Sequence, residues 1–308
     1  MELLIAGTGA LAVLFAARLT QAGHRVTLLG TWRGGLNALK QEGARLVDAA
    51  GNEQSFPVCV TDNPQDCRGA RYAIVLVKSW QTERAARQLA ECLAQDGLAL
   101  TLQNGLGNRE ILVHSLGAGR VLLGTTTGGG TLLGPGLVKP GGEGILSIEA
   151  HPALAPLEDA LRSANFKLDI VQDVRSLVWG KLIINSAINP LTALLRIPNG
   201  ELLNRPPARA LMHALAEETA AVAASEKVKP AFGDPVAIVE QVARDTAVNH
   251  SSMFQDIQRG APTEIDAICG AVTRTGQRNN IPTPINQVCW QLVRALVHSE
   301  GIGADALE

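Results

Sequence analysis

The sequence has few residues of the kinds that build disulfide frameworks or metal sites. Its five cysteines form no CxxC pair, and its six histidines form no HxxxH or Cys/His cluster. Because an odd number of scattered cysteines suits reduced, buried thiols better than disulfides, we expect the thiols to be free. Because zinc sites need several Cys or His ligands at close spacing, we expect no metal site. The cysteines are Cys59, Cys67, Cys92, Cys269 and Cys289.

The chain also lacks a surplus of charge of either sign. Its 27 basic and 29 acidic residues give a formal net charge of −2 and a pI near 6.3. Nucleic-acid binders usually carry a basic surplus, so we expect no nucleic-acid partner. An anionic small molecule would need a local positive site.

Long apolar runs are missing as well. No run reaches the length that spans a bilayer, so we expect no membrane partner. The residues after Met1 enter an apolar strand without the basic stretch and small-residue cleavage site of an export signal. We therefore expect a cytoplasmic protein.

The first half of the chain alternates short apolar runs with helical patterns, which is typical of a doubly wound parallel sheet. Continuous apolar runs suit strands that are buried on both faces. The predicted strands are Leu3–Ala6, Val26–Leu29, Tyr72–Val77 and Leu98–Leu102, and the predicted helices are Ala10–Ala22 and Thr82–Leu93. This order predicts the α/β class with a Rossmann-type N-terminal domain.

Two segments interrupt this alternation. In Ala44–Thr61, Gly51-Asn52 separates two alternating stretches, which indicates an inserted hairpin. Gly124–Gly144 is rich in Gly, Thr and Pro, so we expect a loop or an irregular hairpin there.

The second half has a different pattern, with long helical segments and alanine-rich faces. Examples are Arg209–Lys227, Pro235–Ala247 and Pro284–His298. A chain of 308 residues commonly forms more than one domain. We therefore predict one domain over residues 1–172 and an all-helical domain over residues 173–308.

A glycine-rich loop follows the first predicted strand. It consists of Gly7, Thr8, Gly9, Ala10, Leu11 and Ala12. In the dinucleotide fingerprint, the first glycine permits a tight turn and the second lets backbone amides approach a pyrophosphate at the helix N-terminus. Ala12, at the third position, still allows close packing of helix and sheet. The position directly after a buried strand favours this function over a chance GxG.

The end of the second strand indicates which dinucleotide binds. NAD-preferring sites carry an acid there for the ribose 2′-hydroxyl, whereas this chain reads Gly30-Thr31-Trp32-Arg33. The Arg33 guanidinium would suit the 2′-phosphate of NADP(H). The alternative is that Arg33 is an ordinary solvated arginine.

Five further motifs appear in an order that resembles the ketopantoate reductase family, the NADPH enzymes of pantothenate biosynthesis. They extend over most of the chain, which makes a chance match improbable. They are Val77–Gln81, Gln103–Gly107, Gly124–Thr127, Lys181–Ala193, and Asn249–Met253 followed by Thr263–Asp266.

One of these motifs has a physical interpretation of its own. Lys181, Asn185 and Asn189 are spaced i, i+4 and i+8, so they share one face of an otherwise apolar helix. Such a polar stripe must face water, another polar element or a ligand, because unpaired burial is costly. Alternatives remain: Lys181 could extend to solvent, and Asn189 before Pro190 could end the helix.

The resemblance implies specific roles for residues at matching positions. Lys181 would be the proton donor, with Glu264 beside the ligands as a second catalytic group and a cofactor contact. The implied substrate contacts are Asn104, Lys181, Asn185, Asn189, Asn199 and Ser252. The implied cofactor contacts beyond the glycine loop and Arg33 are Lys78, Asn104 and Gly130.

Several of these roles have plain structural alternatives. Asn199 stands in a Pro198–Gly200 turn, and Ser252 could cap a helix. Glu264 is expected in a helical segment, where most glutamates are solvated. At Gly128–Gly130, three glycines replace the bulkier residues of the family, which leaves the path of that loop open.

We therefore expect NADPH-dependent reduction of ketopantoate to pantoate, with Lys181 as general acid. One alternative is another NADP-dependent 2-keto acid or hydroxyacid dehydrogenase of the same architecture. A second alternative is a non-catalytic NADP sensor, which would need no proton donor. The sequence does not decide the substrate among related keto acids, the strength of the NADP preference, or the oligomeric state, for which a homodimer is one alternative.

Overall fold

The computed structural model describes residues 1–299, and the chain divides into two units. The first unit comprises Met1–Gln103 and Asn108–Val174. The second comprises Asn104–Gly107 and the chain from Arg175 onward. The chain therefore enters the second unit twice, first through a four-residue excursion and again after Val174.

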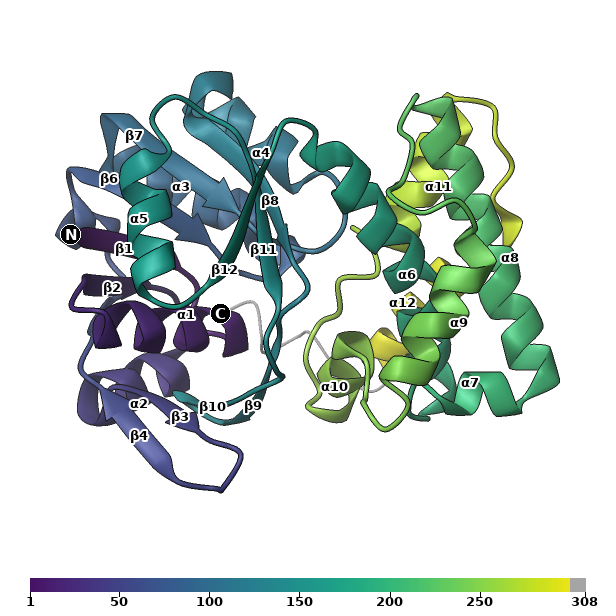
Figure 1. Ribbon diagram of the computed structural model, residues 1–308, viewed down its shortest axis with the longest axis horizontal. Helices are drawn as coiled ribbons and strands as arrows, with labels where there is room; N and C mark the ends of the chain where they lie inside the picture. The colour runs from purple at the N-terminus through teal and green to yellow at the C-terminus, as the bar shows by residue number, and fades with distance from the viewer. Residues whose placement is uncertain (300–308) are drawn as a thin grey trace. The chain divides into compact units, whose positions relative to one another are not determined.

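An eight-stranded sheet forms the centre of the first unit (Figure 1), with strand order β12-β11-β8-β7-β6-β1-β2-β5. Its strands are β1 (Glu2–Ala6), β2 (Arg25–Leu29), β5 (Cys59–Thr61), β6 (Ala70–Val75), β7 (Leu93–Thr101), β8 (Val121–Thr126), β11 (Ile145–Glu149) and β12 (Lys167–Val171). The six strands from β8 to β5 pair in parallel, in the strand order of a Rossmann dinucleotide-binding fold. The predicted α/β class is confirmed.

The strand order reverses beside β1, which pairs with β2 on one side and β6 on the other. Ligands of open parallel sheets bind outside the carboxyl ends of the strands at such a reversal. The glycine loop after β1 lies at this position. β8 pairs antiparallel with β11, and β11 pairs parallel with β12, so the last two strands run opposite to the six others.

Helices cover both faces of this sheet because successive side chains of a buried strand point to opposite sides. Leu3 and Ile5 belong to the core with α1, α2 and α5, whereas Leu4 belongs to the core with α3 and α4. The helices are α1 (Ala10–Gln21), α2 (Arg33–Glu42), α3 (Thr82–Cys92), α4 (Asn108–Leu116) and α5 (Ala155–Ser163). Short 3-10 turns are η1 (Pro64–Cys67), η2 (Ser79–Gln81) and η3 (Ala118–Arg120).

Both interruptions expected from the sequence form hairpins, and together they build a separate four-stranded sheet in the order β4-β3-β10-β9. Its strands are β3 (Ala44–Val47), β4 (Glu53–Phe56), β9 (Gly130–Gly134) and β10 (Leu137–Pro140). The end of the first insertion returns to the main sheet as β5, its edge strand.

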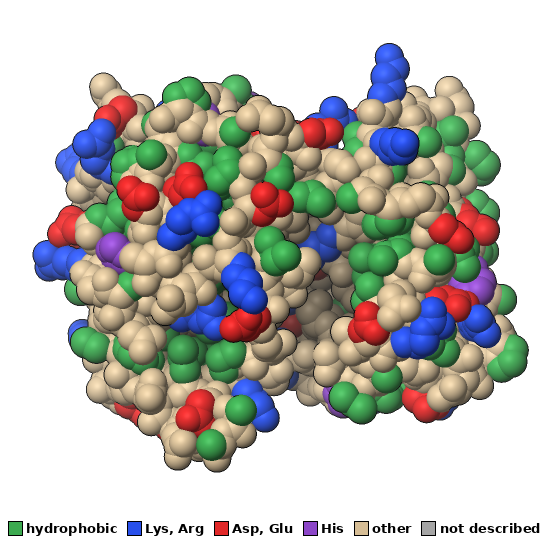
Figure 2. Space-filling view, viewed as in Figure 1, with side chains coloured by type: hydrophobic (Ala, Val, Ile, Leu, Met, Phe, Trp, Pro, Cys, Tyr) green, Lys and Arg blue, Asp and Glu red, His purple; other side chains and the backbone are tan. Residues whose placement is uncertain are grey.

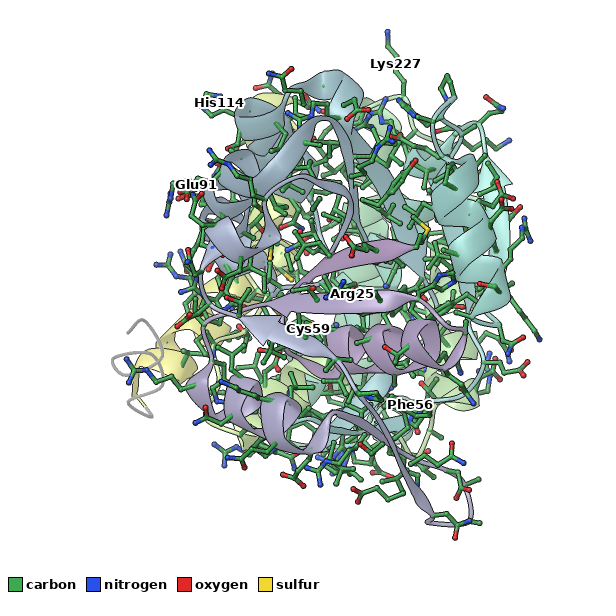
Figure 3. The ribbon with its side chains drawn as sticks, turned by 90° about the vertical axis from the view of Figure 1, so that its left-hand side faces the viewer. Arg25, Phe56, Cys59, Glu91, His114 and Lys227 are labelled. Atoms are coloured by element: carbon green, nitrogen blue, oxygen red, sulfur yellow. The ribbon has the colours of Figure 1, made fainter. Side chains whose placement is uncertain are left out.

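The edge position of β5 corrects one expectation. All five cysteines are free, but only four are buried. Cys59 is exposed because it lies on this edge strand, next to β2 (Figure 3).

Helices form the second unit, and Figure 1 colours them from teal through green to yellow. They are α6 (Val174–Leu195), α7 (Glu201–Asn204), α8 (Pro206–Ser225), α9 (Pro235–Asp245), α10 (Ser252–Gln258), α11 (Cys269–Arg278) and α12 (Pro284–Ser299). Its core includes buried side chains of α6, such as Leu182 and Ile183, packed with Met212 of α8 and Val272 of α11. The predicted helical character of this part is confirmed.

The surface carries charges of both signs. On the face shown in Figure 2, acidic and basic side chains are interspersed over both units. None of the helices within residues 1–299 has the length and apolar composition required to cross a membrane.

Candidate active site

The glycine loop after β1 has the geometry that a pyrophosphate site requires. Gly7 has φ +126°, a conformation that only glycine adopts readily, and a side chain there would lie 3.1 Å from the backbone nitrogen of Val77. A Cβ at Gly9 would meet nothing within 4 Å, so the loop is open above this residue. Helix α1 begins directly after Gly9, with neither a side-chain cap nor an acid in its first turn. Its backbone amides therefore fit an anionic dinucleotide.

The end of β2 packs closely against this loop. A Cβ at Gly30 would lie 2.7 Å from Cγ2 of Thr8, and the backbone N–H of Gly7 donates to the Leu29 carbonyl at 2.8 Å. Arg33 is exposed and is the first residue of α2, three positions after Gly30. Arg33, whose guanidinium is predicted to select NADP(H), therefore lies only three residues after the glycine that packs against the phosphate loop.

Lys78 follows β6 and is half-buried at the start of η2, directly after the Leu76–Val77 peptide that faces Gly7. Gln103 supports this segment, because its side-chain amide donates to the Val77 carbonyl at 2.9 Å and to the Thr82 hydroxyl at 2.8 Å. The position of Lys78 beside the glycine loop therefore depends on a polar network within the first unit.

Gly130 takes a different position from the other predicted cofactor contacts. It begins β9 in the small sheet, where it pairs with Pro140 of β10. The three-glycine segment thus forms the entry to a hairpin, and Gly130 is held there by strand pairing.

In the second unit, Lys181, Asn185 and Asn189 lie along α6. Asn189 is buried, whereas Lys181 and Asn185 are half-buried. The helix does not end at Asn189, because Pro190 lies inside α6, which continues to Leu195. Pro190 has no N–H for the Ser186 carbonyl, which instead accepts from the Cys269 thiol at 3.9 Å. The continuous helix keeps all three side chains on one face.

Lys181 is the titratable group of this stripe. Burial lowers its pKa from the usual 10.5 to about 8, and the negative charge of Glu264 opposes this shift. A lysine in this range gives up a proton far more readily than one in water. Lys181 therefore has the acidity that a proton donor near neutral pH requires.

Glu264 corrects an expectation from the sequence. It lies in a turn between α10 and α11 and not in a helix, and it is only 5% exposed. Its carboxylate accepts a hydrogen bond from the Asn104 side-chain amide at 3.1 Å. Glu264 is therefore a buried, partnered carboxylate and not a solvated one.

The Asn104–Gly107 excursion explains how Asn104 reaches Glu264. Gly105 has φ +81°, and a Cβ there would overlap the carbonyl oxygen of Ala267 and lie 2.6 Å from its carbonyl carbon. The backbone N–H of Leu106 also donates to the Ala267 carbonyl at 2.9 Å. Glycine at position 105 thus lets the excursion lie directly on the turn that carries Glu264.

The structure bears on the structural alternatives for Asn199, a turn residue, and for Ser252, a helix cap. Asn199 lies in the expected turn and donates to the Thr246 hydroxyl at 2.9 Å, but it is buried and its Oδ1 accepts no hydrogen bond from residues 1–299. Ser251, and not Ser252, caps α10 by accepting from the Phe254 N–H at 3.1 Å. Ser252 remains exposed at the first position of the helix.

The predicted residues therefore fall into two groups. Asn104, Lys181 and Glu264 are linked within the second unit by a hydrogen bond and an electrostatic interaction. The glycine loop, Arg33, Lys78 and Gly130 belong to the first unit.

Two polar groups were missed by the sequence analysis. Gln103 organises the segment beside Lys78, and its place in the motif before Asn104 was the available signal. The Trp80 indole N–H is buried without a hydrogen-bond partner among residues 1–299. Its place in the motif Val77–Gln81 was the available signal, but that motif does not indicate an unpartnered N–H.

The sheet order, the phosphate loop and a lysine of lowered pKa together define a nicotinamide-dependent oxidoreductase. Family models identify it more closely. The model for ketopantoate reductase PanE/ApbA matches residues 3–153, and the model for the C-terminal part of the same family matches residues 173–297. The chain belongs to the ketopantoate reductase PanE/ApbA family.

Similar proteins extend over nearly the whole chain. The 2-dehydropantoate 2-reductase of Archaeoglobus fulgidus is 35% identical over 297 residues, covering 95% of this chain and 96% of its own. That of Halobacterium salinarum is 33% identical over 301 residues, covering 96% and 98%. The resemblance expected from the motifs is confirmed.

Solved structures share the fold at full length. A PanE/ApbA family ketopantoate reductase from Ralstonia eutropha has a TM-score of 0.90 and 32% identity, covering 98% of this chain and 100% of its own. A ternary structure of D-mandelate dehydrogenase with NADH and anilino(oxo)acetate has a TM-score of 0.92 and 26% identity, with the same coverage.

Proposed function

We propose that the protein reduces ketopantoate (2-dehydropantoate) to pantoate with NADPH, as a step of pantothenate and coenzyme A biosynthesis. The observation that carries this proposal is Lys181, which shares one face of α6 with Asn185 and Asn189 and has a pKa lowered to about 8 beside the buried Glu264. A family relationship to 2-dehydropantoate 2-reductases supports the choice of substrate.

We assign the nucleotide to residues 1–172 and the keto acid to residues 173–308. The glycine loop, the N-terminus of α1, Lys78 and Arg33 would hold the dinucleotide, with Arg33 at the 2′-phosphate. When bound, NADPH supplies the hydride that adds to C2 of the keto acid. The absence of an acid after β2 supports NADPH over NADH.

Lys181 has two roles in this mechanism. Its ammonium donates a hydrogen bond to the C2 carbonyl oxygen and stabilises the negative charge that develops as the C=O electron pair moves onto oxygen. It then transfers a proton to the alkoxide and becomes a neutral amine. With a pKa of about 8, Lys181 can be populated both as the ammonium and as the neutral amine near neutral pH.

The asparagines and Ser252 would orient the substrate. Asn185 and Asn189 share the face of Lys181, and neutral amides can hold hydroxyl or carboxylate oxygens without changing the charge of the site. The buried Oδ1 of Asn199, which accepts no hydrogen bond within residues 1–299, could accept one from a substrate hydroxyl. Glu264 would keep Asn104 and Lys181 in place.

A substrate panel tests this proposal. We expect NADPH oxidation, followed by the absorbance of the reduced nicotinamide, to have its highest kcat/KM with ketopantoate among branched, linear and aromatic 2-keto acids. A second candidate is favoured by the full-length likeness to D-mandelate dehydrogenase, namely reduction of an aromatic 2-keto acid with NADH. A higher kcat/KM with benzoylformate and NADH than with ketopantoate and NADPH would establish that candidate instead.

We place the reaction in the cytoplasm. Five free cysteines are in keeping with a reducing compartment.

A further inference from the structure

Trp32 has an unusual setting for a tryptophan. It is one of four in the chain, it directly precedes α2 as its N-cap residue, and it is 43% exposed. Removing the rings of a tryptophan from water is favourable, so an exposed tryptophan at a ligand-binding edge can stabilise a ligand that covers it. No role in the mechanism above uses this ring.

One face of the Trp32 indole packs against the first turn of α2. A Cβ at Gly34 would lie 3.3 Å from Nε1 and 3.6 Å from Cζ2 of Trp32, whereas one at Gly35 would overlap Cε3 and lie 2.9 Å from Cζ3. These atoms lie on opposite sides of the ring system, so the contact is made by the ring face and not by an edge. Two consecutive glycines leave the space for it, and the opposite face accounts for the exposure.

The exposed ring is close in sequence to a residue that packs against the phosphate loop. Trp32 follows Gly30 by two residues, and Gly30 packs against Thr8 of that loop, as a Cβ there would lie 2.7 Å from the Thr8 methyl group. In Rossmann-type domains the adenosine half of a dinucleotide extends from the loop after the first strand toward the end of the second. The flat indole thus stands where an adenine base would arrive.

We propose that Trp32 is the adenine platform of the nucleotide site, with the base stacked on the exposed face of its indole and Gly34-Gly35 fixing the opposite face. This proposal rests on the proposed function, because it presumes that a dinucleotide binds at the glycine loop. It assigns two adjacent residues to different parts of the nucleotide: Trp32 binds the base and Arg33 binds the 2′-phosphate. A platform held by glycines is already oriented, so little side-chain freedom is lost on binding.

Binding of 2′,5′-ADP, which has the adenine and the 2′-phosphate but no nicotinamide, tests the platform directly by calorimetry. Stacking of a base on an aromatic side chain predicts that Trp32→Ala raises the Kd about 5- to 150-fold, and Trp32→Phe by less. Gly35→Ala retains the ring but displaces it, so it should also raise the Kd. Trp290→Phe, in the second unit, is the matched control and should leave the Kd unchanged.

Fluorescence gives an independent readout. Adding 2′,5′-ADP should quench part of the tryptophan emission in the wild type and in Trp290→Phe, and this part should be missing in Trp32→Phe. Reduced nicotinamide mononucleotide, which lacks adenine, should bind the wild type and Trp32→Ala equally.

The possible failures are distinguishable. Equal Kd values for 2′,5′-ADP in the wild type and in a folded Trp32→Ala variant would overturn the platform while leaving the proposed reductase intact. A wild type that binds neither 2′,5′-ADP nor NADPH would overturn both.

Discussion

In the proposed mechanism, Lys181 combines the positive charge that would stabilise an alkoxide with a lowered pKa that would let it donate a proton. Because the ammonium is the donating form, the reductive kcat should decrease as the pH rises through about 8, the pKa of this group. Glu264 raises that pKa, so Glu264→Gln should move the alkaline limb of the profile to lower pH. The measurement is kcat against pH at saturating substrate and NADPH.

Glu217 offers a matched control, since it is exposed on α8. Glu217→Gln should leave the limb in place. If the alkaline limb of the kcat profile lies at the same pH in Glu264→Gln as in the wild type, the Glu264 carboxylate does not affect the titrating group.

The proposed choice of NADPH over NADH rests on a single residue, Arg33. A charge-assisted pair with phosphate contributes about 1.5–3 kcal/mol, so Arg33→Ala should lower kcat/KM for NADPH by about tenfold or more and change that for NADH little. Arg25→Ala provides the control, because Arg25 begins β2, the strand that precedes Arg33 in the chain, and is exposed beside Glu2. If the wild type itself uses both cofactors equally well, the predicted role of Arg33 is wrong.

Some site residues could be predicted individually, because local chemistry determines them. The i, i+4, i+8 stripe from Lys181 follows from helix geometry alone, and Gly7 needs only its place after a strand. The burial of Glu264 could not be predicted in this way. The partner of the buried carboxylate, Asn104, lies 160 positions away in the sequence.

At the scale of elements, strands and helices were predicted more reliably than their ends. β7 begins at Leu93 and not at Leu98, since Leu93 pairs with Ala70 of β6 before an irregularity in the register. β5 was taken as part of a hairpin insertion, but it pairs with β2. The extent of pairing at an edge depends on the neighbouring strand, which a local pattern does not contain.

The Asn104–Gly107 excursion makes a prediction about stability and catalysis together. Gly105→Ala introduces a Cβ that overlaps Ala267 and a residue with φ +81°, so it should lower the melting temperature and kcat together. The control is Gly107→Ala, because Gly107 has φ +94° but open space around its Cβ. Backbone strain alone costs about 1–3 kcal/mol, and Gly105→Ala should exceed this control.

Thermal unfolding and kcat of both variants are the measurements. Equal losses in the two variants would show that strain, and not the contact with Ala267, determines the effect.

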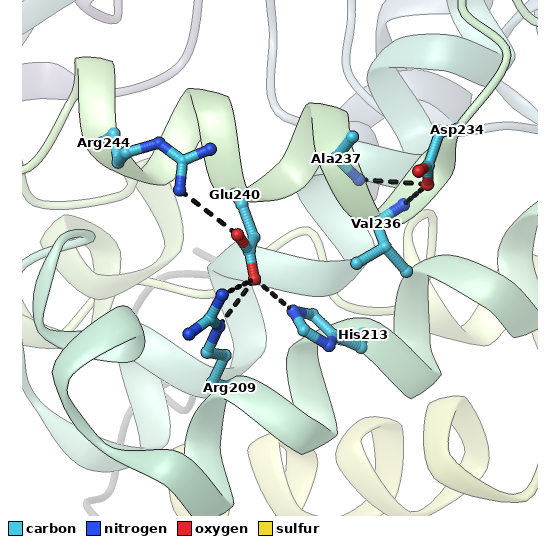
Figure 4. A network of polar contacts seen from close by, with 7 residues as sticks. All are labelled: Arg209, His213, Asp234, Val236, Ala237, Glu240 and Arg244. Atoms are coloured by element: carbon cyan, nitrogen blue, oxygen red, sulfur yellow. Dashed lines mark hydrogen bonds and ion pairs between the residues drawn. The ribbon is translucent and has the colours of Figure 1, made fainter.

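An ion-pair cluster joins α8 and α9 in the second unit (Figure 4). Glu240 accepts hydrogen bonds from Arg209 at 2.6 Å, His213 at 2.7 Å and Arg244 at 3.2 Å. Burial alone raises the Glu240 pKa, but these three partners outweigh it and lower the pKa to about 2.

A carboxylate with a lowered folded-state pKa stabilises the fold above its unfolded pKa of about 4.3, and the stabilisation is lost as the pH falls toward about 2. The difference in urea midpoint between the wild type and Glu240→Gln should therefore shrink from pH 5 to pH 3. A difference that stays constant over this range would mean that the charge of Glu240 contributes nothing.

At the scale of the whole molecule, the sequence pattern predicted an α/β part followed by a helical part, and the order of strands and helices confirms this class. Periodicity is sufficient for this, because parallel strands and amphipathic helices have different repeats. The excursion of Asn104–Gly107 into the second unit could not be predicted, since contacts between segments distant in sequence leave no local pattern.

The most direct test of the proposed mechanism is the kcat of Lys181→Ala with ketopantoate and NADPH. Loss of a general acid predicts a decrease of about 10²- to 10⁴-fold, with the Kd for NADPH unchanged. Lys229→Ala, an exposed lysine of the same unit, should retain the wild-type kcat. A Lys181→Ala enzyme with near-wild-type kcat would contradict the mechanism.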